Sequence, residues 1–184
     1  MIKLVLTFVS LLASFLSVHG GDSLRMTNLD NGTFQHQTKR SSSQYQLPYT
    51  DQIRHPIFDG KEIHIEGTIS STDIRLIIEL CDAQPCLLDY EFQANIRLNT
   101  KTLTMSYKRN LQYGPTTVRE GIPLKTEGPM QIQIVICPQE FKFYLNNTLY
   151  TFTTVVRFTK VNYLRIRGTS HINWILYSVR DELS

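Results

Sequence analysis

The stretch from Phe92 to Pro123 constrains the fold most, because apolar and polar side chains alternate along successive short segments. Its first segment places Phe92, Ala94, Ile96 and Leu98 on one side and Gln93, Asn95, Arg97 and Asn99 on the other. A period of two residues is the signature of a half-buried β-strand. The stretch therefore predicts strands with one face in a core and one face open.

The second segment repeats the pattern and is followed by an aromatic residue. Leu103, Met105 and Tyr107 alternate with Thr104, Ser106 and Lys108, and Tyr113 precedes Gly114-Pro115. Amides, hydroxyls, a guanidinium and a ring are the groups with which proteins bind sugars. The plainer interpretation is that these are ordinary outward residues of an antiparallel sheet, which must be polar on its solvated side.

Further alternating segments continue through the chain, and helical periodicity is scarcely visible. They include residues 62–69, 130–137 and 164–168, and the Asn146-Asn147 turn joins two of them into a predicted hairpin. Many short strands without helices predict an all-β, two-sheet antiparallel jelly-roll sandwich. We expect this domain over residues 55–184, preceded by a flexible polar extension over residues 21–54.

Composition excludes several classes of function. The net charge of +3 is small, and Lys and Arg do not form long runs, which argues against a nucleic-acid partner. There is no phosphate loop, nucleophile elbow or paired metal motif, so we expect no enzyme, no cofactor and no metal. Glu62, His64 and Glu66 share one strand face, but an outward face of a strand explains them without catalysis.

The first twenty residues predict a signal peptide. A positive start at Lys3 precedes an apolar run that ends near Leu16, and small residues follow up to Gly20. The rival interpretation is a membrane anchor, but the run is shorter than the ~20 apolar residues of a membrane span. Secretion to the extracellular space is therefore the expectation.

Three features fit an oxidising, glycosylating compartment. Cys81 and Cys86 bracket a turn-like tetrapeptide, which predicts a disulfide, with Cys137 as a buried thiol; the alternative is two thiols at strand ends. Asn31 and Asn146 begin N-glycosylation sequons, although such tripeptides also occur by chance. The dibasic pair Lys39-Arg40 is either a trimming site or part of an uncut linker.

From Pro56 to Val179 the sequence resembles the galectins. The resemblance rests on Phe58-Asp59-Gly60-Lys61-Glu62-Ile63, the segment from Phe92 to Leu98, Tyr113-Gly114-Pro115, and the segments MQIQIVIC and FKFYLNN. It implies a jelly-roll sandwich with a β-galactoside site on the concave sheet.

The resemblance also assigns roles to individual residues. Asn95 and Arg97 match the family's Asn and Arg, whereas Gln93 stands for its His, Ser106 for its strand Asn, and Tyr113 for its stacking Trp. Thr116 falls where the family has Glu, and Val118 where it has a second Arg. Arg119 would replace that Arg only if a bulge turned it to the other face. A Thr cannot make the charge-assisted bonds of a Glu.

Two hypotheses follow. The first is a secreted lectin whose glycan site, β-galactoside-like or of altered specificity, comprises Gln93, Asn95, Arg97, Ser106, Tyr113, Thr116 and Arg119. The second is a galectin fold without a sugar pocket that binds a protein partner. The resemblance also makes a homodimer through edge strands possible.

Overall fold

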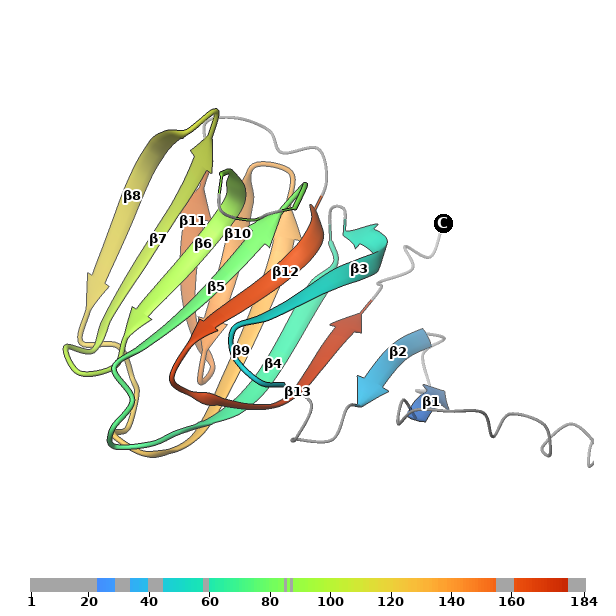
Figure 1. Ribbon diagram of the computed structural model, residues 1–184, viewed down its shortest axis with the longest axis horizontal. Coiled ribbons are helices and arrows are strands. Elements are labelled where there is room, and N and C mark those ends of the chain that lie inside the picture. The colour runs from blue at the N-terminus through green and yellow to red at the C-terminus, as the bar shows by residue number, and fades with distance from the viewer. Residues whose placement is uncertain are drawn as a thin grey trace, which may run out of the picture.

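The computed structural model describes residues 23–28, 34–39, 45–57, 60–84, 86, 88–154 and 161–178, which form two antiparallel sheets packed face to face (Figure 1). The seven-stranded sheet has the order β1 (Ser23–Asn28), β2 (Phe34–Lys39), β13 (His171–Ser178), β4 (Glu62–Ile69), β9 (Gly128–Cys137), β10 (Glu140–Leu145) and β11 (Thr148–Thr153). The six-stranded sheet has the order β3 (Tyr49–Ile57), β12 (Val161–Gly168), β5 (Arg75–Cys81), β6 (Tyr90–Arg97), β7 (Thr102–Arg109) and β8 (Gln112–Glu120). The described residues contain no helix, so the all-β sandwich is confirmed.

The core fills the space between the sheets and follows the predicted alternation. Phe92 of the six-stranded sheet stacks on Phe141 of the seven-stranded sheet, with ring centroids 4.7 Å apart. Isoleucines of β4 and β9, together with Phe143 and Phe152, complete a continuous buried cluster. Because alternate residues of β6 enter this core, the residues between them must point to the outside.

Two tight hairpins set the register of the edge strands. Asn110-Leu111 joins β7 to β8, and Asn146-Asn147 joins β10 to β11; all four residues have positive φ. Two central residues with φ > 0 are characteristic of the turn whose twist matches a two-stranded ribbon. Asn tolerates this conformation well, whereas Leu111, at φ 62°, does not.

The described strands begin earlier than the sequence suggested. β1, β2 and most of β3 lie in the segment expected to be a flexible extension, and Tyr45 and Tyr49 are buried in the core. β2 extends the seven-stranded sheet by pairing with β13. The sandwich thus includes residues well before position 55, because polar segments gain backbone hydrogen bonds from an existing sheet edge.

The predicted cysteine pairing is confirmed, whereas the expected burial of Cys137 is wrong. Cys81 and Cys86 form a disulfide with Cα atoms 5.6 Å apart. Cys137 lies outside this bond, but it is partly exposed at the end of β9 rather than buried, because β9 turns toward β10 there. The signal peptide, Asn31 and Arg40 lie outside the described residues. In the described part of the chain, no helix is long and apolar enough to cross a membrane.

Candidate functional site

The outer side of the six-stranded sheet, which we call the polar face, carries most of the predicted site. Gln93, Asn95 and Arg97 alternate with the buried Phe92, Ala94 and Ile96, and therefore point away from the core. The register places Gln93 between Glu79 and Ser106, and Arg97 between Arg75 and Thr102. Two rows of side chains across three strands thus join the predicted residues to β5 residues that the sequence had not singled out.

Asn95 is held by an arginine of the neighbouring strand. The Nε atom of Arg75 donates to Asn95 Oδ1 at 2.7 Å, and the Asn95 side chain is only 6% exposed. This bond uses one acceptor site of the amide and leaves its NH₂ group available as a donor. Asn95 is therefore oriented by the protein before any ligand arrives.

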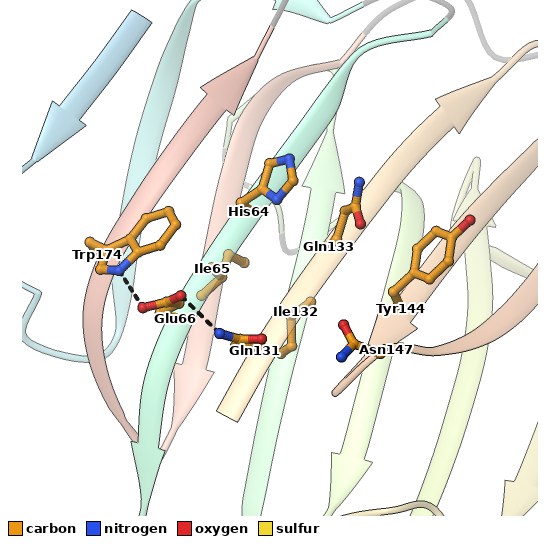
Figure 2. Close-up of a pocket in the computed structure, with 9 residues that line it drawn as sticks. All are labelled: His64, Ile65, Glu66, Gln131, Ile132, Gln133, Tyr144, Asn147 and Trp174. Atoms are coloured by element: carbon orange, nitrogen blue, oxygen red, sulfur yellow. Dashed lines mark hydrogen bonds between the residues drawn. The ribbon is translucent and has the colours of Figure 1, made fainter. Parts of the chain in front are cut away.

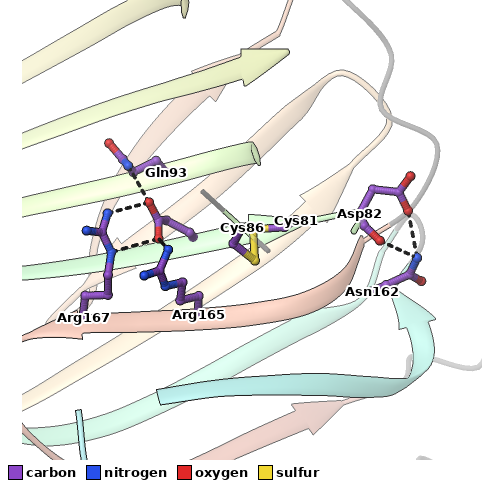
Figure 3. Close-up of a disulfide and its surroundings, with 8 residues drawn as sticks. Cys81, Asp82, Cys86, Gln93, Asn162, Arg165 and Arg167 are labelled. Atoms are coloured by element: carbon purple, nitrogen blue, oxygen red, sulfur yellow. Dashed lines mark hydrogen bonds and ion pairs between the residues drawn. A yellow bond between two sulfur atoms is a disulfide. The ribbon is translucent and has the colours of Figure 1, made fainter. Parts of the chain in front are cut away.

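A buried carboxylate, Glu79, organises the other half of the polar face. Figure 3 labels the three side chains that gather around it, Gln93, Arg165 and Arg167. Arg167 donates to it twice, from Nε at 3.1 Å and from Nη2 at 2.8 Å, and Gln93 Nε2 donates at 2.8 Å. Arg165 Nη1 lies 3.7 Å from the same carboxylate. Glu79 is 1% exposed, so this is a buried ion cluster with two arginines on one acid.

Ser106 and Tyr90 form the next part of the face. A β-bulge between Tyr90 and Gln93 reverses the alternation of β6, so the Tyr90 ring packs with the disulfide on the outer side. Burial raises the pKa of Tyr90, and a hydrogen bond with the Ser106 side chain partly offsets that rise. Because Ser106 is buried, its role is to hold the Tyr90 side chain in place.

The edge strand β8 supplies an exposed ring. Tyr113 lies opposite Lys108, is 71% exposed, and has the Lys108 ammonium 5.3 Å from its ring centroid. A bulge follows, and Thr116 then lies opposite Ser106. Tyr113 and Thr116 are thus on the polar face, as expected.

Arg119 is not on this face. It pairs with Leu103, whose side chain is fully buried, so Arg119 points to the opposite side of the sheet. The bulge in β8 lies between Tyr113 and Thr116 and leaves Val118 and Glu120 on the polar face instead. The condition under which Arg119 would replace the family's second Arg is therefore not met.

The Glu62, His64 and Glu66 row lies on the outer side of the other sheet. His64 Nε2 is 3.0 Å from Glu62 Oε2, and Gln133 Nε2 donates to the same oxygen at 2.8 Å. No group of three His, Cys, Asp or Glu residues in the described ranges is arranged to hold a metal ion. The row is a hydrogen-bonded outer face.

With this geometry established, comparison with known proteins identifies the family. The galactoside-binding lectin model matches residues 48–177, which is most of the chain. The chain belongs to the galectins. A search among curated proteins found no match to the sequence.

Solved galectin structures share the fold at low sequence identity. Chicken galectin 2 superposes with a TM-score of 0.63 at 15% identity, covering 71% of this chain and 98% of its own. CG-16, a homodimeric agglutinin from chicken liver, gives 0.63 at 16% identity, covering 71% and 98%. A toad ovary galectin in complex with thio-digalactose gives 0.62 at 12% identity, covering 70% and 96%. At such identities the match concerns the fold alone.

Sequence reasoning missed the β5 and β12 half of this galectin's polar face. Glu79 stands in the apolar segment Leu76–Leu80, and a charge in such a segment is rarely buried without a partner. The alternation of Leu164, Arg165, Ile166 and Arg167 places both arginines on one side of a strand. These two signals together could have identified the cluster.

Proposed function

We propose that this galectin is a secreted, non-enzymatic lectin that binds anionic glycans on its polar face. The observation that carries the proposal is the pair Arg75 and Arg97, which lie directly opposite each other on β5 and β6. Both are exposed, and neither has a carboxylate within 4.0 Å among the described residues. Like charges directly opposite each other destabilise a sheet, so an anion bound here would relieve repulsion.

The charge of the whole face supports the same ligand class. Among the side chains that the structure describes, five cations and two carboxylates lie on this face, and one of the carboxylates, Glu79, already interacts with two arginines. Thr116 stands where the galectin pattern has a Glu, so the face lacks an acceptor that would orient its cations and bind sugar hydroxyls. The cations are Arg75, Arg97, Lys108, Arg165 and Arg167, and the carboxylates are Glu79 and Glu120.

The size of the face favours an oligosaccharide. Arg97 pairs with Thr102 and Tyr113 with Lys108, so six residues of β7 separate the arginine pair from the exposed ring. At ~3.3 Å per residue this is about 20 Å along the strand. In the proposed complex, Tyr113 stacks on one sugar ring while Arg97, Arg75 and Asn95 bind an acidic group farther along the chain.

A glycan array with neutral, sulfated and sialylated members tests this proposal. We expect signal on anionic members, loss of it in Arg97→Ala, and weaker signal in Tyr113→Ala. Arg119→Ala is the matched control, because it removes the same charge from the opposite side of the sheet. Anionic-glycan binding that survives both polar-face substitutions, or neutral-glycan binding that Arg97→Ala abolishes, contradicts the proposal.

A second candidate function is a protein-interaction module, favoured by the exposed apolar side chains of the β7–β8 hairpin. Leu111, Tyr113 and Val118 are each at least half exposed on this edge of the sheet. An edge strand with unpaired backbone groups can pair with another chain, including a second copy. No array signal, together with a dimer that Val118→Lys dissociates in light scattering, would favour this function.

Secretion and glycosylation complete the proposal. Asn146 lies in the β10–β11 turn, where Gln131 N donates to its Oδ1 at 2.9 Å. The sequon Asn146-Asn147-Thr148 is thus on a tight turn at the edge of the sheet, which suits enzymatic access. Expression in a secreting cell, followed by glycosidase treatment and mass spectrometry, tests signal cleavage and both sequons together.

A further inference from the structure

A groove on the outer side of the seven-stranded sheet is the second feature of this molecule that resembles a sugar site (Figure 2). Its volume is about 240 Å³, and it lies on the side of the sandwich opposite the polar face. We call it the Trp174 groove. Its polar and aromatic lining consists of His64, Glu66, Gln131, Gln133, Tyr144, Asn147 and Trp174.

Two rings stand at opposite sides of a polar floor. The register places Trp174, Glu66 and Gln131 in one row across the sheet, and His64, Gln133 and Tyr144 in the next row. Trp174 lies on β13 and Tyr144 on β10, three strand spacings of ~4.8 Å apart. Figure 2 shows the carboxylate and amide groups between the two rings. This spacing suits one or two pyranose rings.

Hydrogen bonds hold the side chains of this floor in place before any ligand binds. The indole Nε1 of Trp174 donates to Glu66 Oε2 at 2.5 Å, and Gln131 Nε2 donates to Glu66 Oε1 at 3.1 Å. Because the amide nitrogen of Gln131 is used in this way, its carbonyl oxygen remains able to accept a sugar hydroxyl. The bulge in β13 before Trp174 brings the ring onto this row.

Other groups at the groove have hydrogen-bonding capacity to spare. The Tyr144 hydroxyl and the Asn147 amide have no hydrogen-bond partner in the described ranges. Partly exposed amphipathic rings beside an amide with unused donors and acceptors form the arrangement that recognises a sugar, whose faces are apolar and whose rim is hydroxylated.

The charge of the groove selects the ligand. The described residues of its lining include the carboxylate of Glu66 and no Lys or Arg. An anionic sugar would be repelled here, whereas hydroxyl groups can donate to the carboxylate. We propose that the Trp174 groove is a second saccharide site, specific for a short neutral saccharide. It would make the protein bivalent, with an anionic glycan on one side of the sandwich and a neutral one on the other.

The single tryptophan gives this proposal a selective test. Trp174 is the chain's only Trp, so its fluorescence reports on the groove and not on the polar face. Lactose, chitobiose and α-mannobiose are titrated in turn into the mature protein. We expect saturable change with at least one of them and none with N-acetylneuraminic acid. Tyr144→Ala should weaken binding about five- to tenfold, the value of one ring contact.

Matched controls separate this site from the polar face and from surface effects. Lys142 lies two residues from Tyr144 on the same side of β10 but outside the groove, so Lys142→Ala should leave the titration unchanged. Arg97→Ala should also leave it unchanged, even if the array result for the polar face fails. Loss of the fluorescence change in Arg97→Ala would assign the signal to the polar face and overturn the proposal.

The neighbouring sequon requires a second form of the protein. Asn147 lines the groove beside Asn146, so a glycan on Asn146 could cover it. Thr148→Ala removes the sequon and keeps the hydrogen bonds of Asn146. A saturable change in either form, weakened by Tyr144→Ala, supports the proposal. Absence of any change in both forms, for all three neutral disaccharides, overturns it.

Discussion

Arg75 and Arg97 lie opposite each other on adjacent strands, with no carboxylate within 4.0 Å of either among the described residues. Arg75 has a hydrogen bond to Asn95, but this does not neutralise its charge. Repulsion between the two guanidinium groups therefore lowers the free energy of unfolding of the ligand-free protein, a cost that is common at binding sites.

Arg97→Ala should stabilise the ligand-free protein while it removes anionic-glycan binding. Relief of the cross-strand repulsion is worth about 0.2–1 kcal/mol. Urea unfolding at low and high salt measures this, and the gain should shrink in high salt because exposed charges are screened. Arg119→Ala should show no such gain. A destabilised Arg97→Ala protein would mean that Arg97 has a structural role instead.

Glu79→Gln should destabilise the protein strongly. The substitution keeps the shape of the side chain but leaves Arg165 and Arg167 without their buried counter-ion. Breaking a buried ion pair in this way costs about 3–5 kcal/mol. The control is Glu120→Gln, an exposed acid on the same sheet, which should change the unfolding free energy by no more than about 0.5 kcal/mol. Equal effects from the two substitutions would contradict the buried cluster.

Gly114→Ala should disrupt the edge strand beside Tyr113. A Cβ atom at Gly114 would lie 2.1 Å from Cζ of Tyr107, whose ring fills that space. Overpacking of this kind costs about 1–3 kcal/mol. In a Tyr107→Leu background the clash is removed, so the same substitution should be nearly neutral there. A double-mutant cycle with no coupling between the two positions would rule out this contact as the cause.

Stability should fall in alkali because of Tyr177. Its hydroxyl donates to Asp51 Oδ2 at 3.1 Å, and burial, together with the Asp51 charge, raises its pKa well above 10.0. Its contribution is full below pH 10 and is lost as the pH rises further, because the unfolded tyrosine ionises while the folded one keeps its proton. Each such group contributes a slope of up to about 1.4 kcal/mol per pH unit.

Tyr177→Phe is the check on that slope. Denaturant unfolding between pH 9 and 11 should show a shallower fall for the variant than for the parent protein. Tyr90 and Tyr150, whose pKa values are also raised by burial, keep part of the slope in both proteins. Parallel pH profiles would show that Tyr177 is not the group responsible.

The two-sheet architecture could be predicted from the sequence because its strands alternate so regularly. Phe92, Ala94 and Ile96 entered the core as expected, and the Asn146-Asn147 hairpin formed where the pattern placed it. The early strands were missed because residues 21–54 carry few apolar residues to mark a buried face. Their pairing depends on sheet edges that are formed by residues far along the chain, such as β13.

Which side chains lie on the polar face could be predicted for β6 to β8 and not beyond. Glu79 and Arg167 are 88 residues apart, and only the register of β5 with β12 brings them together. The two bulges could not be predicted from the sequence either. One places Tyr90 on the polar face, and the other leaves Arg119 on the opposite side of β8. Alternation identifies the two sides of a strand, but a bulge shifts that assignment by one residue.

The most direct measurement compares lactose with its 3′-sulfate by isothermal titration calorimetry on the mature protein. We predict that the sulfated sugar binds to the polar face at least about tenfold more tightly, a difference of about 1.4 kcal/mol. This preference should disappear in Arg97→Ala and persist in Arg119→Ala. Equal affinity for the two sugars at the site that Arg97→Ala removes, or tighter binding of lactose at that site, would contradict this prediction.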